Sequence, residues 1–135
     1  MIEKRFEGIA SNFEMAQSFV NDLLVSHGCP ESVRLEIDLA IEEIFVNIAD
    51  YAYTPDIGDV DMKAWISDDG MRLTLIFEDS GTPFDPLEKP DPDITLSASE
   101  RQLGGLGIFL VKETMDDMTY EYKDGKNQLT LVKGW

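Results

Sequence analysis

Glu43 and Asn47 stand four residues apart in the segment 39–53, which reads LAIEEIFVNIADYAY. On a helix, residues four apart lie side by side on one face, so this pattern places a carboxylate beside an amide. A carboxylate can accept a proton from an attacking hydroxyl, and an amide oxygen is a hard ligand suited to Mg²⁺. Many helices carry such a pair facing water, so the pair indicates a reactive site only when other segments accompany it.

Asp79 and Gly81 follow an apolar stretch, in the segment 78–86, EDSGTPFDP. A carboxylate at the end of a strand can accept a hydrogen bond from an amino group such as that of adenine, and a glycine lets backbone and ligand approach closely. A plain turn is the alternative, because Asp, Gly and Pro are all turn residues.

A glycine-rich segment, Gly104, Gly105, Leu106 and Gly107, opens a predicted helix. The free N–H groups and the dipole of a helix N-terminus bind an anion without a basic side chain, which matters in a chain this acidic. The glycines do not follow a strand, as a dinucleotide fingerprint requires, and no Gly-Lys-Ser/Thr of a P-loop occurs. The segment is a candidate phosphate site outside those two motifs.

Helices and hairpins that the chain predicts must position these three segments. Helical spacing of apolar residues predicts two successive helices, and alternation predicts two hairpins. We expect a capping box of Ser11 and Glu14 at the start of the first helix, and Pro30 in the first position of the second. The expected elements are an edge strand over 2–10, a helix from Ser11 to Gly28, a helix from Pro30 to about Tyr53, a hairpin of Val60 to Ile66 and Met71 to Glu78, a helix from Leu106 to about Asp117, and a hairpin of Met118 to Lys123 and Asn127 to Lys133.

This order favours a two-layer α/β sandwich, with a mixed, mostly antiparallel sheet and helices on one face. The stretch from Ser80 to Gln102 holds four prolines and is longer than a usual connection, so we expect a lid or binding segment, with a disordered surface loop as the alternative. With 135 residues, the chain is expected to form a single domain over 1–135.

The composition limits the classes of partner. A formal net charge of -16 repels polyphosphate backbones, so nucleic acid and anionic membranes are poor partners. The acidity favours basic protein partners, with a solvated acidic surface that has no specific partner as the alternative. Cys29 is the only cysteine, which excludes an internal disulfide. We interpret His27, the only histidine, as a favourable charge at a helix C-terminus rather than a catalyst. No signal peptide or membrane span is visible, and we expect a soluble cytoplasmic protein.

Taken together, the three segments resemble the N, G1 and G2 boxes of the GHKL ATPase superfamily, that of gyrase, the heat-shock chaperone, mismatch-repair and histidine-kinase ATP domains. Within it, AIEEIFVNIADYAY, FEDSGTPFDP and GGLGIFLVK look most similar to the anti-sigma-factor serine/threonine kinases of bacterial partner switching. The resemblance spans nearly the whole chain and implies the Bergerat ATPase fold. Pro83 departs from it, because many members carry a second glycine there, and so does Tyr51, where related kinases often carry histidine.

The resemblance implies a role for each matching residue. Asn47 would hold Mg²⁺ and Glu43 would act as general base, while Asp79 and Gly81 would recognise the adenine of ATP. The backbone N–H groups of the segment from Gly104 through Gly105 and Leu106 to Gly107 would bind phosphates. Arg101 would reach the terminal phosphate or a partner, with a solvated arginine as the alternative.

The function that follows is a Mg-ATP-dependent serine/threonine protein kinase and anti-sigma factor. It would phosphorylate a small anti-anti-sigma protein of the STAS type and, when free of it, sequester a sigma factor; a homodimer is implied by the resemblance only. The alternative is a binding module that uses ATP to control its affinity for a protein partner without phosphoryl transfer. A histidine-kinase ATP domain would need a phosphoacceptor histidine in a helical hairpin, a context that His27 lacks, and an acidic sandwich without a ligand is the remaining possibility.

Overall fold

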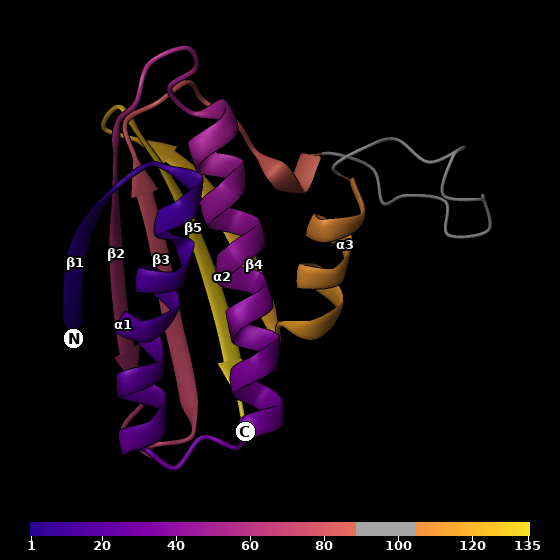
Figure 1. Cartoon of the computed structure of the whole chain (residues 1–135). Coiled ribbons are helices and arrows are strands. Elements are labelled where there is room, and N and C mark those ends of the chain that lie inside the picture. The colour runs from indigo at the N-terminus through magenta and orange to yellow at the C-terminus, as the bar shows by residue number, and fades with distance from the viewer. Residues whose placement is uncertain (89–104) are drawn as a thin grey trace.

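A computed structural model of the chain describes residues 1–88 and 105–135. Within these residues, one antiparallel sheet of five strands forms the back layer of the molecule (Figure 1). The strand order is β1-β2-β3-β5-β4, so β1 and β4 are the two edges and the strand predicted near the N-terminus is an edge strand. All four neighbouring pairs are antiparallel. The strands are β1 (Ile2–Glu7), β2 (Asp59–Ile66), β3 (Arg72–Asp79), β4 (Asp117–Lys123) and β5 (Lys126–Gly134).

Two long helices, α1 (Phe13–Ser26) and α2 (Glu31–Tyr51), cover one face of this sheet (Figure 1). A shorter helix, α3 (Gly105–Thr114), lies beside α2 on the side of β4. Two single turns of 3-10 helix, Ala10–Asn12 and Pro86–Glu88, complete the regular elements of the described residues. The predicted two-layer α/β sandwich with helices on one face is confirmed. None of the described helices is both long enough and apolar enough to cross a membrane.

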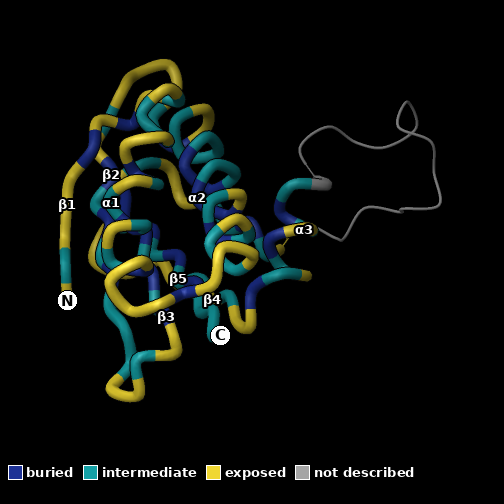
Figure 2. The backbone as a smooth tube through the Cα atoms, turned by 60° about the horizontal axis from the view of Figure 1, so that its bottom comes forward, coloured by how far each residue is buried: buried dark blue, intermediate teal, exposed yellow. Residues whose placement is uncertain are grey.

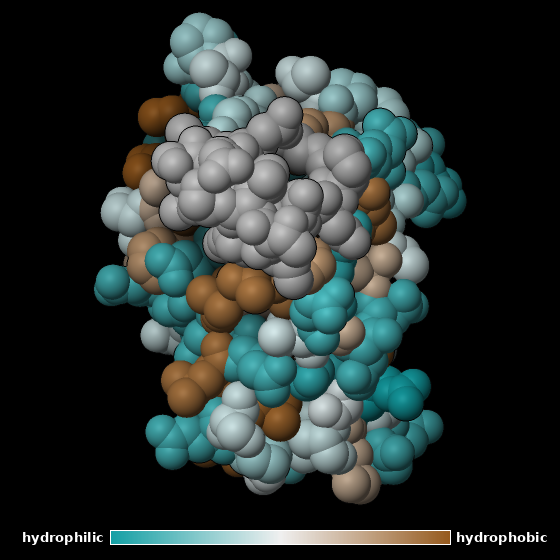
Figure 3. Space-filling view, turned by 90° about the vertical axis from the view of Figure 1, so that its right-hand side faces the viewer, coloured by the Kyte–Doolittle hydropathy of each residue, from teal (hydrophilic) through white to brown (hydrophobic). Residues whose placement is uncertain are grey.

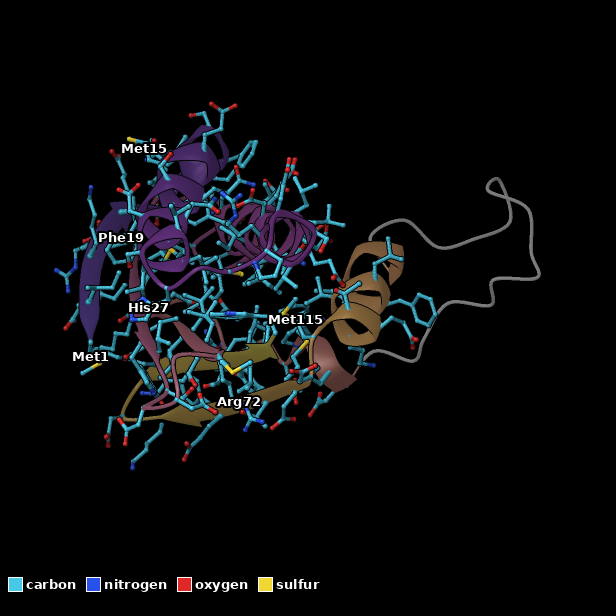
Figure 4. The ribbon with its side chains drawn as sticks, turned by 90° about the horizontal axis from the view of Figure 1, so that it is seen from below. Met1, Met15, Phe19, His27, Arg72 and Met115 are labelled. Atoms are coloured by element: carbon cyan, nitrogen blue, oxygen red, sulfur yellow. The ribbon has the colours of Figure 1, made fainter. Side chains whose placement is uncertain are left out.

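Buried apolar residues form a core between the helices and the sheet. Figure 2 marks the buried positions of the chain in dark blue. Ile37, Ile41 and Ile44 of α2 are buried there, as their helical spacing predicts, whereas Ile48 is only partly buried. In the view from below, Met115, just after α3, lies inside this layer and Met15 of α1 points away from it (Figure 4). The core therefore fixes the face that α2 presents to the sheet, and with it the direction of the polar stripe of α2, which consists of Glu43 and Asn47.

The predicted capping box at the start of the first helix is wrong. Ser11 lies inside the 3-10 turn, and α1 begins at Phe13 without a side-chain cap. Asn12, the residue before α1, donates its side-chain N–H to the carbonyl of Glu7, at 2.9 Å between nitrogen and oxygen. Its backbone N–H donates to the carbonyl of Ile9, also at 2.9 Å. The 3-10 turn thus connects β1 to α1, and it occupies the position at which the Ser11 cap was predicted.

Other element ends shift by a few residues, which is the usual uncertainty of such ends. Pro30 is the extended residue before α2 rather than its first helical residue, and α2 ends at Tyr51 rather than Tyr53. The third helix ends at Thr114 instead of Asp117, where β4 begins. The two predicted hairpin turns are confirmed, with positive φ angles at Gly70 and at Asp124-Gly125, and φ > 0 is the conformation that these turns require.

Candidate functional site

A pocket opens between the C-terminal half of α2 and the ends of the central strands. Its walls are mostly apolar, and its polar groups come from α2, from the end of β3 and from β5. The lining residues are Ile44, Asn47, Ile48, Tyr51, Ala52, Phe77, Asp79, Thr82, Phe84, Pro86, Tyr120, Asn127 and Leu129. Apolar walls with a few convergent polar groups are typical of a small-molecule site.

Asp79 is the last residue of β3 and is 6% exposed. Its Oδ1 atom accepts two hydrogen bonds, from the backbone N–H of Gly81 and from the side-chain amide of Asn127, each at 2.9 Å. Within the described residues no hydrogen bond reaches Oδ2. Burial raises the pKa of Asp79, and the bonds from Asn127 and Gly81 oppose that rise. The carboxylate therefore has one oxygen held by the protein and one available to a donor in the pocket.

Gly81 is required by a close approach of two backbone segments. A Cβ at this position would overlap the carbonyl of Ala52, the C-cap residue that follows α2. The next residue, Thr82, donates its N–H to that same carbonyl at 2.7 Å. This contact satisfies one of the carbonyls that a helix end leaves free, so Gly81 lets the loop after β3 dock on α2.

Tyr53 also holds this loop, from the other side. Its hydroxyl accepts the backbone N–H of Ser80 at 2.8 Å and donates to the carbonyl of Asp59 at 2.7 Å. Gly58 lies against the tyrosine ring, where a Cβ would overlap it. Tyr53 thus connects the end of α2, the start of β2 and the turn that follows Asp79.

Glu43 lies directly against the first turn of α3. A Cβ at Gly107 would overlap the Glu43 carboxylate, so the glycine is what allows this approach. Burial raises the pKa of Glu43, and the neighbouring Glu42 carboxylate raises it further. The structure therefore brings together two of the segments that the sequence singles out, the polar stripe of α2 and the glycine-rich start of α3.

Asn47 is one helical turn beyond Glu43 and lines the pocket together with Asp79. The described residues contain no group of three or more His, Cys, Asp or Glu side chains that would hold a metal by themselves. One amide oxygen fits the way proteins bind Mg²⁺ with nucleotides, in which one or two protein ligands are completed by phosphates and water. The donor set is thus compatible with a phosphate-bridged ion.

The C-terminal end of α3 is held by Lys133 of β5. Its ammonium group donates to the carbonyl of Thr114 at 2.6 Å and lies 3.6 Å from a carboxylate oxygen of Glu36 on α2. A cation at this end of a helix also interacts favourably with the helix dipole. Lys133 therefore ties α3 to both the sheet and α2, with the glycine-rich end of α3 next to Glu43.

Several predicted site residues are not placed. Arg101 and Gly104 lie outside the described residues, as does the stretch from 89 to 102 of the predicted lid. Gly105 and Leu106 form the first turn of α3, so the predicted helix start at the glycine-rich segment is present.

Sequence reasoning missed Asn127, Tyr120 and Tyr53, which hold the site through contacts distant in sequence. Asn127 accepts the hydroxyl of Tyr120, donates to Asp79, and is 6% exposed. One signal was visible: Asn127 shares the inward alternation of Leu129 and Leu131, and a polar residue in an apolar row indicates a specific partner. Tyr53 carried no such signal.

Comparison with known proteins identifies a matching family and several relatives. A family model described as a histidine kinase-like ATPase domain matches residues 10–133. The serine/threonine-protein kinase BtrW of Bordetella bronchiseptica is 28% identical over 100 residues, covering 74% of this chain and 70% of BtrW.

Two other relatives are similar to the same degree. The serine-protein kinase RsbW of Bacillus cereus is 30% identical over 98 residues, which cover 70% of this chain and 60% of RsbW. The anti-sigma F factor of a Thermoanaerobacter species is 28% identical over 133 residues, covering 98% of this chain and 90% of that protein.

Proposed function

The chain belongs to the histidine kinase-like ATPase domain family, and from this premise we propose that it is a Mg-ATP-dependent serine/threonine protein kinase. Its substrate is a small anti-anti-sigma protein of the STAS type, and without that substrate it sequesters a sigma factor. The observation that carries the proposal is the convergence of α2, β3 and α3: Asn47 and Asp79 line one pocket, and Glu43 lies against Gly107 beside it. The relatives named as serine kinases and as an anti-sigma factor support the kinase and anti-sigma parts of the proposal.

Asp79 recognises the base in this proposal. Its free Oδ2 accepts a hydrogen bond from the 6-amino group of adenine, and the apolar walls exclude water from that bond. Guanine carries an oxygen in the same position, which the carboxylate would repel. The pocket therefore favours adenine nucleotides.

The groups that we propose for phosphate binding and proton transfer lie on α2 and at the start of α3. The backbone N–H groups at the start of α3, at Gly105, Leu106 and Gly107, would bind the phosphates. Gly104 and Arg101, which lie outside the described residues, complete the proposed phosphate-binding segment. Asn47 holds Mg²⁺, which when bound neutralises phosphate charge. Glu43 accepts the proton of the substrate hydroxyl, and its raised pKa makes it a stronger base once it is ionised.

Two exposed leucines lie within about one helical turn, along α2 and α3, of the contact between Glu43 and Gly107. Leu39 is four residues before Glu43 on α2 and is 47% exposed, and Leu110 is three residues after Gly107 on α3 and is 40% exposed. Apolar side chains gather on this face of the molecule (Figure 3). An apolar rim around the general base suits a folded protein as phosphoacceptor, and the net charge of -16 favours basic residues around it.

Phosphoryl transfer to a purified candidate antagonist, with labelled Mg-ATP, tests this function. A Glu43→Gln variant is expected to keep ATP binding and to lose transfer by a factor of about 10² to 10⁴, the usual contribution of a general base. Glu42→Gln, at the neighbouring carboxylate, is the matched control and is expected to stay within about threefold of the original chain. Unchanged transfer by Glu43→Gln would contradict the assignment of the base.

The same assay separates the kinase from an ATP-controlled binding module. Nucleotide binding with no phosphoprotein from any candidate antagonist would favour the module. The proposal also includes a homodimer and a cytoplasmic location, which rest on the resemblance to partner-switching kinases and on the composition. Light scattering of the purified chain measures the first, and fractionation of the native cell measures the second.

A further inference from the structure

Asn127 is one of three polar residues that are buried in the described part of the chain, and the other two are Glu78 and Asp79. Its position in β5 is directly opposite Asp79 in β3, because the two residues are register partners. Nothing in the apolar row of β5 requires a polar residue at this point. The partners of Asn127 therefore indicate its role.

The side-chain amide of Asn127 uses all its strong hydrogen-bonding capacity within the protein. Its nitrogen donates to Asp79 Oδ1 at 2.9 Å and to the carbonyl of Thr82 at 3.0 Å. Its oxygen accepts the backbone N–H of Phe84 at 3.1 Å and the hydroxyl of Tyr120. An amide has two donors and two acceptor positions, so none is left for a ligand. Asn127 must therefore influence a bound base through its neighbours rather than by contact.

Asn127 acts on two parts of the pocket, the Asp79 carboxylate and the loop from Thr82 to Phe84. The bond to Asp79 fixes the carboxylate so that Oδ1 is engaged and Oδ2 remains available. The bonds to Thr82 and Phe84 hold the loop whose side chains form a wall of the same pocket, where the Phe84 ring stacks on Tyr51 with 6.3 Å between ring centroids. One side chain thus sets both the orientation of the acceptor and the position of the wall.

We propose that Asn127 is the positioning residue that makes this pocket selective for purine nucleotides bearing a 6-amino group. It holds Asp79 Oδ2 toward the base. It also fixes the loop from Thr82 to Phe84, so that this wall of the pocket contacts the base while Asp79 accepts its amino group. The proposal rests on the nucleotide site described under the proposed function and adds a residue to it. Without Asn127, Asp79 keeps one bond on Oδ1, from Gly81, and is free to rotate away from the base.

The test compares two nucleotides in each variant, Mg-ATP and the triphosphate of purine riboside, which lacks the 6-amino group. The original chain is expected to bind Mg-ATP at least about tenfold more tightly, because one hydrogen bond to a charged group distinguishes the two ligands. In Asn127→Leu, which keeps the branched shape of the side chain but has no polar atom, that ratio is expected to fall below about threefold through loss of ATP affinity. A structural defect would instead weaken both nucleotides alike.

Gln128→Leu is the matched control, because this neighbouring amide points to the opposite face of β5 and donates to Glu78 at 3.3 Å. It is expected to keep the ratio of the original chain. If Asn127→Leu does not fold, Asn127→Ser, which retains a small hydrogen-bonding group, is used and is expected to lower the ratio to a lesser extent.

The outcomes separate the two proposals. Cooperatively melting Asn127 variants with the original ratio would overturn the role of Asn127 and leave the nucleotide site intact. An original chain that binds neither nucleotide would overturn the proposed function itself. An original chain that binds both equally would overturn base recognition by Asp79, and the selectivity assigned to Asn127 with it.

Discussion

Glu43, the proposed general base, has a raised pKa, and this sets a pH dependence. A base works only when it is ionised, so kcat/KM for phosphoryl transfer is expected to be full above the raised pKa and to be lost as the pH falls through it. Because burial and Glu42 raise the pKa of Glu43 above its ordinary value of 4.5, the acid limb of the profile should lie above that value. Measurement of kcat/KM from about pH 4.5 to 8 checks this, since this ratio reports groups of the free enzyme.

The Glu42→Gln variant removes the neighbouring carboxylate, which is the second cause of the raised Glu43 pKa after burial. If that cause is correct, the acid limb of the kcat/KM profile moves to lower pH in this variant. An acid limb at or below the ordinary value of 4.5 in the original chain would contradict the assignment of Glu43 as the ionised base.

Gly107 provides a second test at the scale of single residues. In Gly107→Ala the new Cβ would displace the Glu43 carboxylate, which is the far end of a flexible side chain. We expect phosphoryl transfer to fall by about 10²-fold, as for other small displacements of catalytic groups. The melting temperature should change little, since alanine favours a helix by about 1 kcal/mol over glycine and offsets the strain.

A double variant shows whether the two residues act together. If Gly107→Ala acts by moving Glu43, adding it to Glu43→Gln should cost almost nothing further. Fully additive losses would mean that Gly107 affects transfer by a separate route, such as phosphate binding at the start of α3.

At the scale of elements, the site depends on how α2 ends. The carbonyl of Ala52 and the hydroxyl of Tyr53 both receive N–H groups from the loop after β3, one from Thr82 and one from Ser80. A helix end, a strand end and a loop are thereby fixed as one unit beneath the pocket. The position of Asp79 is therefore a property of this junction as much as of β3.

Tyr53→Phe tests the junction by removing one hydroxyl. The loss of its bonds to Ser80 and Asp59 is expected to cost about 1 kcal/mol of unfolding free energy. ATP affinity should fall several-fold because the turn after Asp79 loosens, as measured by calorimetric titration. Tyr122→Phe, at a tyrosine of β4 that is 47% exposed, is the control and should leave both quantities unchanged. Equal ATP affinity in the two variants would show that the junction does not position Asp79.

At the scale of the whole molecule, nucleotide binding should raise the free energy of unfolding. A ligand that binds only the folded state stabilises it by about 2.7 kcal/mol at one hundred times its dissociation constant. For a domain of this size we expect Mg-ATP at that level to raise the melting temperature by on the order of 10 °C. Mg-GTP at the same concentration is the control and should give a much smaller shift. Equal shifts for the two nucleotides would contradict selection of adenine.

Much of the fold follows from local pattern. The spacing of Ile37, Ile41 and Ile44 predicts the buried face of α2, and Gly70 and Gly125 mark turns that only a few residue types adopt. Helical spacing and turn residues depend only on residues close together in the chain, so the sequence alone predicts them. The Ser11 cap failed for the opposite reason, because Asn12 found a partner in Glu7 that competes with the local pattern.

The candidate site was predictable only in part. The spacing of Glu43 and Asn47 places both on one side of α2, and the structure puts Asn47 in a pocket with Asp79. The partners that hold the site come from 48 residues away for Asp79 and Asn127, and from 27 residues away for Ser80 and Tyr53. Pairings at that separation depend on the register of β3 with β5 and on the docking of α2, which no local pattern encodes.

The register pair of Asp79 and Asn127 has a consequence for how the protein folds. Each belongs to a different hairpin, β2–β3 or β4–β5, and in the described part of the chain these two hairpins pair with each other through the β3–β5 ladder. A hairpin closes within microseconds, whereas joining two hairpins across a long intervening chain is slower because the loop entropy must first be lost. The nucleotide pocket needs residues of both hairpins, so we expect it to be complete only after the β3–β5 ladder has formed. A bound nucleotide would hold that ladder closed and slow the first step of unfolding.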